Sequence, residues 1–355
     1  MRVEIPEPDW FLDNVLATAG RDRRVLGPAS DWQRSWREEF SRLQIVRDGA
    51  TETVLPLAAT QGYVLSRAQA MAAGVPPSTV RRLVRRGSWQ RVRYGVLAIV
   101  GTDGGSGLIE QRRRHALDAA AGALIRPDHV VSARSAAVLH GLPVRRLPES
   151  AELTARPVRS GGRTAALLVR EAALPARQVT DWFGVPTTSV ARTVADLSRH
   201  DPRDGVMAAD AALRESLTTR RELSGVIDGC AGWPGVRSAR LIRDLADPRA
   251  ESPLESLVRL EIRTSQLPPP DLQVEIRVAG RTYRVDFLWR RQRLVLEADG
   301  RGKYTGDELW AEKRRELALT RAGYRVERVV WADLGRGWPA VAARLRSVLA
   351  ASPPR

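Results

Sequence analysis

The chain has 355 residues, 43% of them hydrophobic and 28% charged, a composition typical of a globular protein with two or three domains. Its 57 basic and 41 acidic residues give a net charge of +16, which favours a polyanionic partner, and we expect nucleic acid. The single cysteine, Cys230, excludes an internal disulfide and a cysteine-based zinc cluster. No apolar run reaches the roughly 20 residues of a membrane helix and the first residues lack a signal-peptide layout, so we expect a cytoplasmic protein with no membrane partner.

Residues 1–50 give no functional indication. Aromatic residues recur at helical spacing between residues 31 and 47, which predicts one amphipathic helix. We interpret the segment as an N-terminal extension and assign it no role.

Residues 51–102 have the element order of a winged helix-turn-helix. The pattern predicts a short helix over Val54–Thr60, a second helix opened by the capping-box sequence Ser66–Gln69, a third over Thr79–Arg86, and two strands around a turn. The third helix would enter the major groove of DNA. Its predicted DNA-contacting residues are Thr79, Arg81, Arg82 and Arg85. The alternative is a small helical scaffold with a solvated basic face.

Three segments of this region carry a resemblance to a known family: Gln61–Ala70, Gly74–Arg82 and Gly87–Leu97. They resemble the N-terminal domain of AbiEi-type antitoxins of type IV toxin–antitoxin systems. In that family the domain is a winged helix that represses its own operon. The resemblance therefore implies two partners, double-stranded DNA and a cognate toxin.

Residues 103–247 are typical of a mixed α/β middle region. Helices are predicted over Ile109–Ile125 and Val131–Gly141, and short strands and further helices follow. Thr187–Leu197 is similar to the corresponding part of AbiEi-like proteins, but no group of residues here combines a nucleophile with a base. Asp244–Pro253 contains two prolines and is the predicted linker.

Residues 252–355 predict the order helix, three strands, helix, strand, helix. The second and third strands are expected over Arg281–Trp289 and Arg293–Asp299. Alternation places Glu297 and Asp299 on one strand face, and a hairpin would bring Asp286 beside them. Carboxylates in strand interiors are costly unless they are paired or bind a metal. A metal site is one interpretation; an exposed face, or pairing with nearby arginines, is the alternative.

A second resemblance is carried by Ser252–Glu255, Val285–Phe287, Leu296–Gly300 and Glu312–Arg315. These segments resemble the very short patch repair endonuclease and its relatives in domain-of-unknown-function family 559, which are PD-(D/E)XK nucleases. The resemblance implies an α/β restriction-endonuclease-like domain (αβββαβα) that hydrolyses phosphodiester bonds with Mg²⁺ or Mn²⁺.

Asp286 and Glu297 would be the primary metal ligands, because hard divalent cations prefer carboxylate oxygens. Glu255, on the first helix, would hold a metal-bound water or add a ligand. Asp299 stands where this class of nuclease usually has a lysine. Either Lys303 supplies the amine from four residues on, or Asp299 is a third metal ligand, or the site has lost cleavage.

The chain has only two lysines, Lys303 and Lys313, and both follow the acidic strands. A primary amine is a compact point charge with a tunable pKa, unlike a guanidinium. Lys303 would stabilise the developing charge of the reaction, and Lys313 would clamp a phosphate together with Arg314.

The sequence as a whole predicts an α+β multidomain protein that binds DNA and carries a metal-dependent deoxyribonuclease-like C-terminal domain. The alternative is an AbiEi-like antitoxin or transcriptional regulator whose nuclease-like domain is catalytically inactive. A helical interaction protein kept soluble by its charge is the third option.

Overall fold

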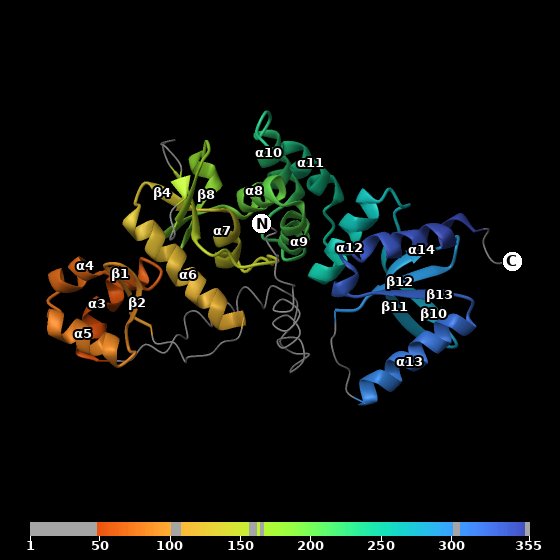
Figure 1. The fold of residues 1–355 in the computed structure, drawn as a ribbon, viewed down its shortest axis with the longest axis horizontal. Coiled ribbons are helices and arrows are strands. Elements are labelled where there is room, and N and C mark those ends of the chain that lie inside the picture. Colours follow the sequence, from red (N-terminus) through yellow and green to blue (C-terminus); the bar gives the residue numbers. More distant parts are fainter. Residues whose placement is uncertain (1–47, 101–107, 156–161, 164–166, 301–305, 352–355) are drawn as a thin grey trace, which may run out of the picture.

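The computed structural model describes residues 48–100, 108–155, 162–163, 167–300 and 306–351. Three sheets organise these residues, and helices pack around each of them (Figure 1). The structure confirms the prediction of a mixed α+β chain with several sheets. The predicted N-terminal amphipathic helix and Lys303 lie outside the described residues.

The first sheet is formed by residues 64–98 and has the strand order β1-β3-β2. Its elements are α3 (Gly49–Ala59), β1 (Val64–Ser66), α4 (Arg67–Ala72), α5 (Pro77–Arg85), β2 (Gln90–Arg93) and β3 (Val96–Ala98). The predicted capping box of α4 is confirmed, because Ser66 and Gln69 each accept a hydrogen bond from the other's main-chain N–H. The three-residue β1, too short to show alternation, was not predicted.

The middle of the chain holds a six-stranded sheet with the order β6-β7-β5-β4-β9-β8. Its elements are α6 (Leu108–Ile125), β4 (His129–Val131), α7 (Ala133–Leu139), β5 (Ala151–Ala155), β6 (Gly162–Arg163), β7 (Leu167–Glu171), β8 (Val179–Trp182), β9 (Val185–Thr188), α8 (Val190–His200), α9 (Pro202–Arg214), α10 (Arg220–Asp228) and α11 (Val236–Leu245). The predicted start of a helix at Val131 is wrong. Val131 pairs with Leu153 and Thr187, and the helix begins only after the extended Ser132.

Helix α6 connects the first two sheets. Its alanines, such as Ala116 and Ala120, are buried in one core with Val64 and Val96 of the first sheet and with residues of the second. Small side chains on α6 allow both sheets to approach the helix closely. The side chain of Arg93 in β2 also forms an ion pair with Asp118 at 2.7 Å.

Residues 253–350 form the third sheet and its helices. The elements are α12 (Pro253–Thr264), β10 (Asp271–Val278), β11 (Arg281–Trp289), β12 (Leu294–Ala298), α13 (Gly306–Arg321), β13 (Arg325–Val329) and α14 (Trp338–Ala350). The strand order is β10-β11-β12-β13, with β12 and β13 parallel and the other pairs antiparallel.

Helices cover both faces of this sheet. Residues of α12 and α14, such as Val258 and Val341, are buried with Phe287 and Leu296 on one face. Leu319 of α13 is buried with Val285, Val295 and other residues of the opposite face. The acids of β11 and β12 therefore lie in a sheet with a helix layer on each side (Figure 1).

The predicted linker Asp244–Pro253 connects α11 and α12 but is closely packed. Ala246 and Ala250 are buried. The carboxylate of Asp210 in α9 accepts hydrogen bonds from the main-chain N–H of Asp247 at 2.7 Å and from Arg259 at 2.6 Å. Helix α12 is thus fixed to α9 as well as to the third sheet. None of the described helices is long and apolar enough to span a bilayer.

Candidate nucleic-acid interface and acidic site

Glu255 is positioned by the first turn of α12. Ser252 is the N-cap residue, and its hydroxyl accepts a hydrogen bond from the Glu255 N–H at 3.1 Å. The Glu255 carboxylate is buried, with 6% of the residue exposed. Its Oε2 atom accepts from the main-chain N–H of Glu251 at 2.9 Å and from Gln273 Nε2 at 2.8 Å.

Asp286 and Glu297 come from neighbouring antiparallel strands. Phe287 pairs with Leu296. Asp286 precedes Phe287 in β11 and Glu297 follows Leu296 in β12, so the two acids stand at the adjacent position of the antiparallel pair. Asp286 accepts hydrogen bonds from the Ala298 N–H at 2.9 Å and from Gln273 Nε2 at 3.2 Å. Gln273 thus bridges Asp286 to Glu255, and the three predicted acids of α12, β11 and β12 lie together.

Gln273 is a site residue that the sequence interpretation missed. It lies on β10 between Leu272 and Val274, which pair with Phe287 and Val285, so it is opposite Asp286. Its φ of 52° is in the left-handed region, which costs a non-glycine residue about 1 kcal/mol or more. The available signal was a polar side chain inside a strand that neighbours an acidic strand.

Burial changes the pKa values of Glu255 and Asp286. It raises the pKa of Glu255 to about 7, and the Asp286 charge adds to the effect. Burial also raises the pKa of Asp286. The hydrogen bond from the Ala298 N–H stabilises the charged form and acts in the opposite direction, but the effect of burial is larger. Both acids therefore hold protons more tightly than exposed carboxyls do, and a nearby cation would favour their charged forms.

One cation is already present beside the acids. Arg315 of α13 donates from Nη2 to Glu297 Oε1 at 2.8 Å and to the main-chain carbonyl of Arg284 at 2.5 Å. This contact agrees with the sequence alternative in which the acids pair with nearby arginines. Arg315 was not among the predicted site residues.

Asp286 and Glu297 fit a Mg²⁺ site of the kind that uses two carboxylates together with substrate phosphates. The predicted set of three ligands is not found: among the residues that the structure describes, no three His, Cys, Asp or Glu side chains are grouped to hold a metal. β12 ends at Ala298, and the main-chain N–H of Asp299, the next residue, donates to the carbonyl of Val329 in β13 at 2.9 Å.

The predicted phosphate clamp lies on the surface of α13. Lys313 and Arg314 are both exposed, and the Lys313 ammonium lies 5.4 Å from the ring centre of Trp310. The structure therefore brings Glu255, Asp286 and Glu297 together and leaves these two cations outside that group.

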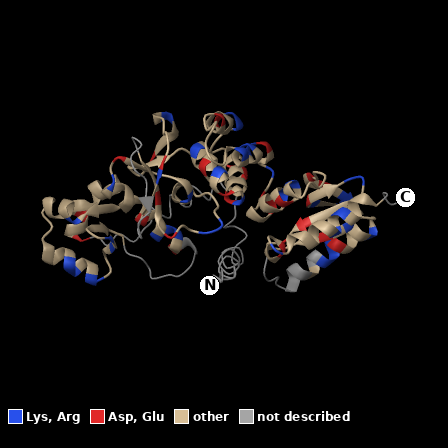
Figure 2. Cartoon of the chain, turned by 45° about the horizontal axis from the view of Figure 1, so that its top comes forward, with Lys and Arg blue, Asp and Glu red and all other residues tan. Residues whose placement is uncertain are grey.

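Helix α5 presents the other predicted site. Arg81, Arg82 and Arg85 are exposed, Thr79 is half-buried, and Val80 and Leu83 are 4% and 3% exposed. This division follows from helical periodicity, which puts the apolar residues on one face and the arginines on the other. In the cartoon of Figure 2 the basic residues of α5 lie at the outer end of the molecule.

The charge of this region is of one sign. Residues 53–100 contain no Asp or Glu and seven arginines, at positions 67, 81, 82, 85, 86, 91 and 93. Arg93 is engaged with Asp118, whereas Arg91 is exposed. The turn between β2 and β3 also carries Tyr94, which is 100% exposed and which the sequence interpretation did not single out.

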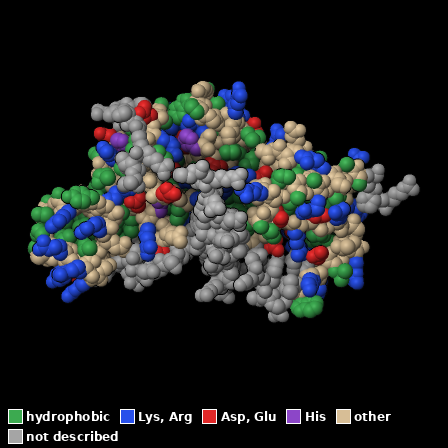
Figure 3. Space-filling view, viewed as in Figure 1, with side chains coloured by type: hydrophobic (Ala, Val, Ile, Leu, Met, Phe, Trp, Pro, Cys, Tyr) green, Lys and Arg blue, Asp and Glu red, His purple; other side chains and the backbone are tan. Residues whose placement is uncertain are grey.

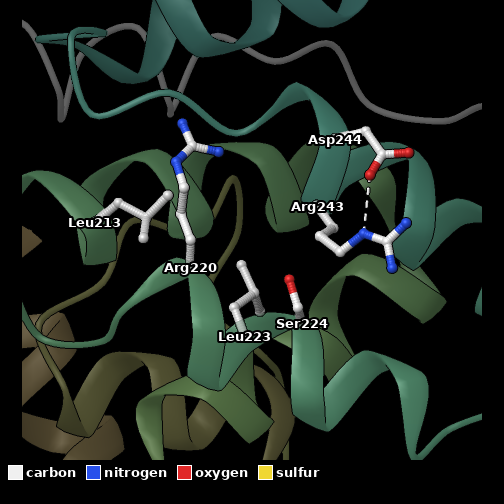
Figure 4. A pocket seen from close by; sticks show the side chains of 6 residues that line it. All are labelled: Leu213, Arg220, Leu223, Ser224, Arg243 and Asp244. Atoms are coloured by element: carbon white, nitrogen blue, oxygen red, sulfur yellow. Dashed lines mark hydrogen bonds and ion pairs between the residues drawn. The ribbon is translucent and has the colours of Figure 1, made fainter.

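A pocket of about 230 Å³ lies elsewhere, between α9, α10 and α11 (Figure 4). Its lining residues are Leu213, Arg220, Leu223, Ser224, Arg243 and Asp244. Arg243 pairs with Asp244 at 2.8 Å, and Arg220 donates to the Ala246 carbonyl at 2.7 Å. Both guanidinium groups are thus used within the protein, and no predicted site residue lines this pocket.

Comparison with known proteins gives one family and two relatives. Two uncharacterized proteins, from two strains of Mycobacterium tuberculosis, are each 34% identical to the chain over 161 residues. The alignment covers 44% of this chain and 59% of each relative, so the chain spans about three fifths of their length. Residues 52–100, which contain α4, α5 and the first sheet, match the family described as transcriptional regulator, AbiEi antitoxin.

Proposed function

We propose that the chain is a DNA-binding protein whose residues 51–102 form a winged helix-turn-helix. The observation that carries the proposal is the exposed basic face of α5. It lies in a segment, residues 52–100, that matches an antitoxin family of transcriptional regulators and has Glu52 as its single acid. In such domains the last helix of the motif enters the major groove. Here α5 would take that role, and β2 and β3 would form the wing.

Phosphate contacts supply the binding energy in this proposal. Arg81, Arg82 and Arg85 lie within two turns of α5 and would release counterions from the DNA as they contact phosphates. A guanidinium can also bind guanine with two hydrogen bonds, so the same residues would contribute to sequence preference. Tyr94, at the tip of the wing, would contact the sugar–phosphate backbone through its hydroxyl.

For the C-terminal region we propose a restriction-endonuclease-like domain that hydrolyses phosphodiester bonds in DNA. The support is the grouping of three acids. Gln273 joins Glu255 to Asp286, and Glu297 lies on the neighbouring strand and pairs with Arg315 of α13, a helix that carries exposed cations. Asp286 and Glu297 would hold Mg²⁺ or Mn²⁺, which would supply Lewis acidity and an activated water.

The protein's own groups would support this chemistry in three ways. Glu255, which Gln273 joins to Asp286, would accept or release a proton at Oε1 or Oε2. Gln273 would keep the Glu255 and Asp286 carboxylates oriented. Lys313 and Arg314 would hold a phosphate of the substrate.

The alternative function is a regulator, with a cognate toxin as a second partner, whose C-terminal domain binds but does not cleave. Two observations favour it. Asp299 stands at the usual lysine position, and Arg315 already balances the charge of Glu297.

A plasmid assay separates the two functions. The nuclease proposal predicts that the purified chain nicks or linearises supercoiled plasmid with Mg²⁺ or Mn²⁺, and that Asp286→Ala combined with Glu297→Ala abolishes cleavage without reducing duplex affinity. A matched control, Glu261→Ala, changes an acid of α12 outside the group. If the wild-type chain cleaves no substrate with either metal while it still binds DNA, the enzyme proposal is wrong and the regulator remains.

A further inference from the structure

Helix α13 has an exposed stripe that the protein core does not bury, and it includes Lys313 and Arg314, the two cations proposed above to hold a substrate phosphate. Trp310 is 64% exposed and Leu317 is 48% exposed, both unusually high for such large apolar side chains. Lys313, Arg314 and Arg321 are exposed as well. Figure 3 shows hydrophobic and basic side chains next to each other over the end of α13 where the helix begins.

Helix geometry places these residues on one face. At 3.6 residues per turn, positions 310, 313, 314, 317 and 321 fall within an arc of about 100°. Leu319, which is buried against the sheet, lies on the opposite side of the same helix. We refer to Trp310, Lys313, Arg314, Leu317 and Arg321 as the α13 face. It contains two apolar groups and three cations, and no acid among the side chains that the structure describes.

We infer that the α13 face binds single-stranded nucleic acid, with an unpaired base stacked on Trp310. A flat indole with cations on either side is the combination by which proteins hold single strands without sequence preference, since every base has a π-face and every nucleotide a phosphate. The Lys313 ammonium, 5.4 Å from the Trp310 ring centre, lies where it can reach a phosphate next to a stacked base.

The charge of the face argues for nucleic acid and against an apolar protein partner. Three cations within about two and a half turns would have to be desolvated under an apolar surface, which is unfavourable, whereas a polyanion offsets that cost. In a duplex each base pair is stacked between its neighbours, so the faces of the bases are covered and Trp310 has no stacking partner. The ligand inferred for the α13 face is thus a single strand, whereas the ligand proposed for α5 is a duplex. Binding of a single strand to α13 requires no cleavage activity.

The test is the affinity of the full chain for a short fluorescent oligothymidylate and for a labelled duplex, measured by anisotropy. The measurement is made in the background Arg81→Ala, Arg82→Ala, Arg85→Ala, so that α5 does not dominate. Trp310→Ala is expected to weaken oligothymidylate binding by about fivefold or more, and Trp310→Phe to retain most of it, because phenylalanine also stacks. Ile125→Ala, an exposed apolar residue of α6, is the control and should have no effect.

Two results would overturn the inference. One is unchanged oligothymidylate affinity in both Trp310→Ala and a Lys313→Ala, Arg314→Ala variant. The other is concentration-dependent self-association of the wild-type chain that Trp310→Ala removes, which would identify a second copy as the occupant. Failure of the α5 proposal would be separate, because it would appear as weak duplex binding by a chain with an intact α5.

Discussion

The N-terminal and C-terminal regions place their charges in opposite ways. Around α5 the arginines point to solvent, and the core beneath them is apolar, with Val80, Leu83 and Trp89 buried. In the third sheet and at its junction with α9, charged groups are inside: Glu255, Glu297 and Asp210 are at most 8% exposed. Outward charges cost folding little, whereas inward charges must be compensated by partners.

This difference separates binding from chemistry. The arginines of an exposed face stay hydrated in the free protein, and a polyanion that binds them releases its counterions. Buried carboxylates have raised pKa values and a defined orientation, which are the properties that an acid–base or metal site requires. The same properties make the C-terminal region sensitive to single substitutions, and the predictions below use that sensitivity.

The largest expected effect is at the junction of α9 and α12. Asp210→Ala would leave the buried Arg259 guanidinium without its carboxylate and remove the acceptor of the Asp247 N–H. We expect the free energy of unfolding to fall by about 3–5 kcal/mol, measured by urea denaturation. Arg85→Ala, at an exposed charge, is the comparison and should change it by about 0.5 kcal/mol or less. Equal changes in the free energy of unfolding for the two substitutions would contradict the distinction between buried charges in the C-terminal region and exposed charges on α5.

A smaller effect is expected in the pH dependence of stability. The pKa of Glu255 rises from 4.5 to about 7 on folding, so between these values the folded chain binds more protons than the unfolded chain. This group therefore lowers the free energy of unfolding as pH increases from 4.5 to 7, by about 2–3 kcal/mol. Glu255→Gln removes that contribution.

Urea unfolding at a series of pH values checks this prediction. The stability of Glu255→Gln relative to wild type should increase as pH rises through this window and then level off above pH 7. Parallel pH profiles for the two proteins would show that Glu255 is not the titrating group.

The sequence predicted the elements that depend on local signals. The strand β11 has the predicted bounds, and the predicted capping box of Ser66 and Gln69 is present. β1 and β4 have three residues each, and they form strands only because sheets supply partners distant in sequence. Tertiary pairing of that kind leaves no periodic pattern.

The sequence predicted only part of the acidic site, again because contacts between separate elements leave no local pattern. The strand pattern identified Asp286 and Glu297, and the resemblance carried by Ser252–Glu255 pointed to Glu255; each of these signals lies within a single element. Gln273 and Arg315 reach the acids from β10 and α13, across packing that only the folded chain defines.

The central claim is that α5 is the DNA-binding surface. The measurement that tests it most directly is duplex affinity as a function of salt for the wild-type chain and for the variant Arg81→Ala, Arg82→Ala, Arg85→Ala. If the three arginines contact phosphates, the slope of log K against log salt should become shallower by up to about 3, with a loss of affinity of tenfold or more at low salt. A control triple of exposed arginines on α10 and α11 (Arg221, Arg237 and Arg240) should leave both quantities unchanged. Equal slopes and affinities for wild type and the α5 variant would contradict the account.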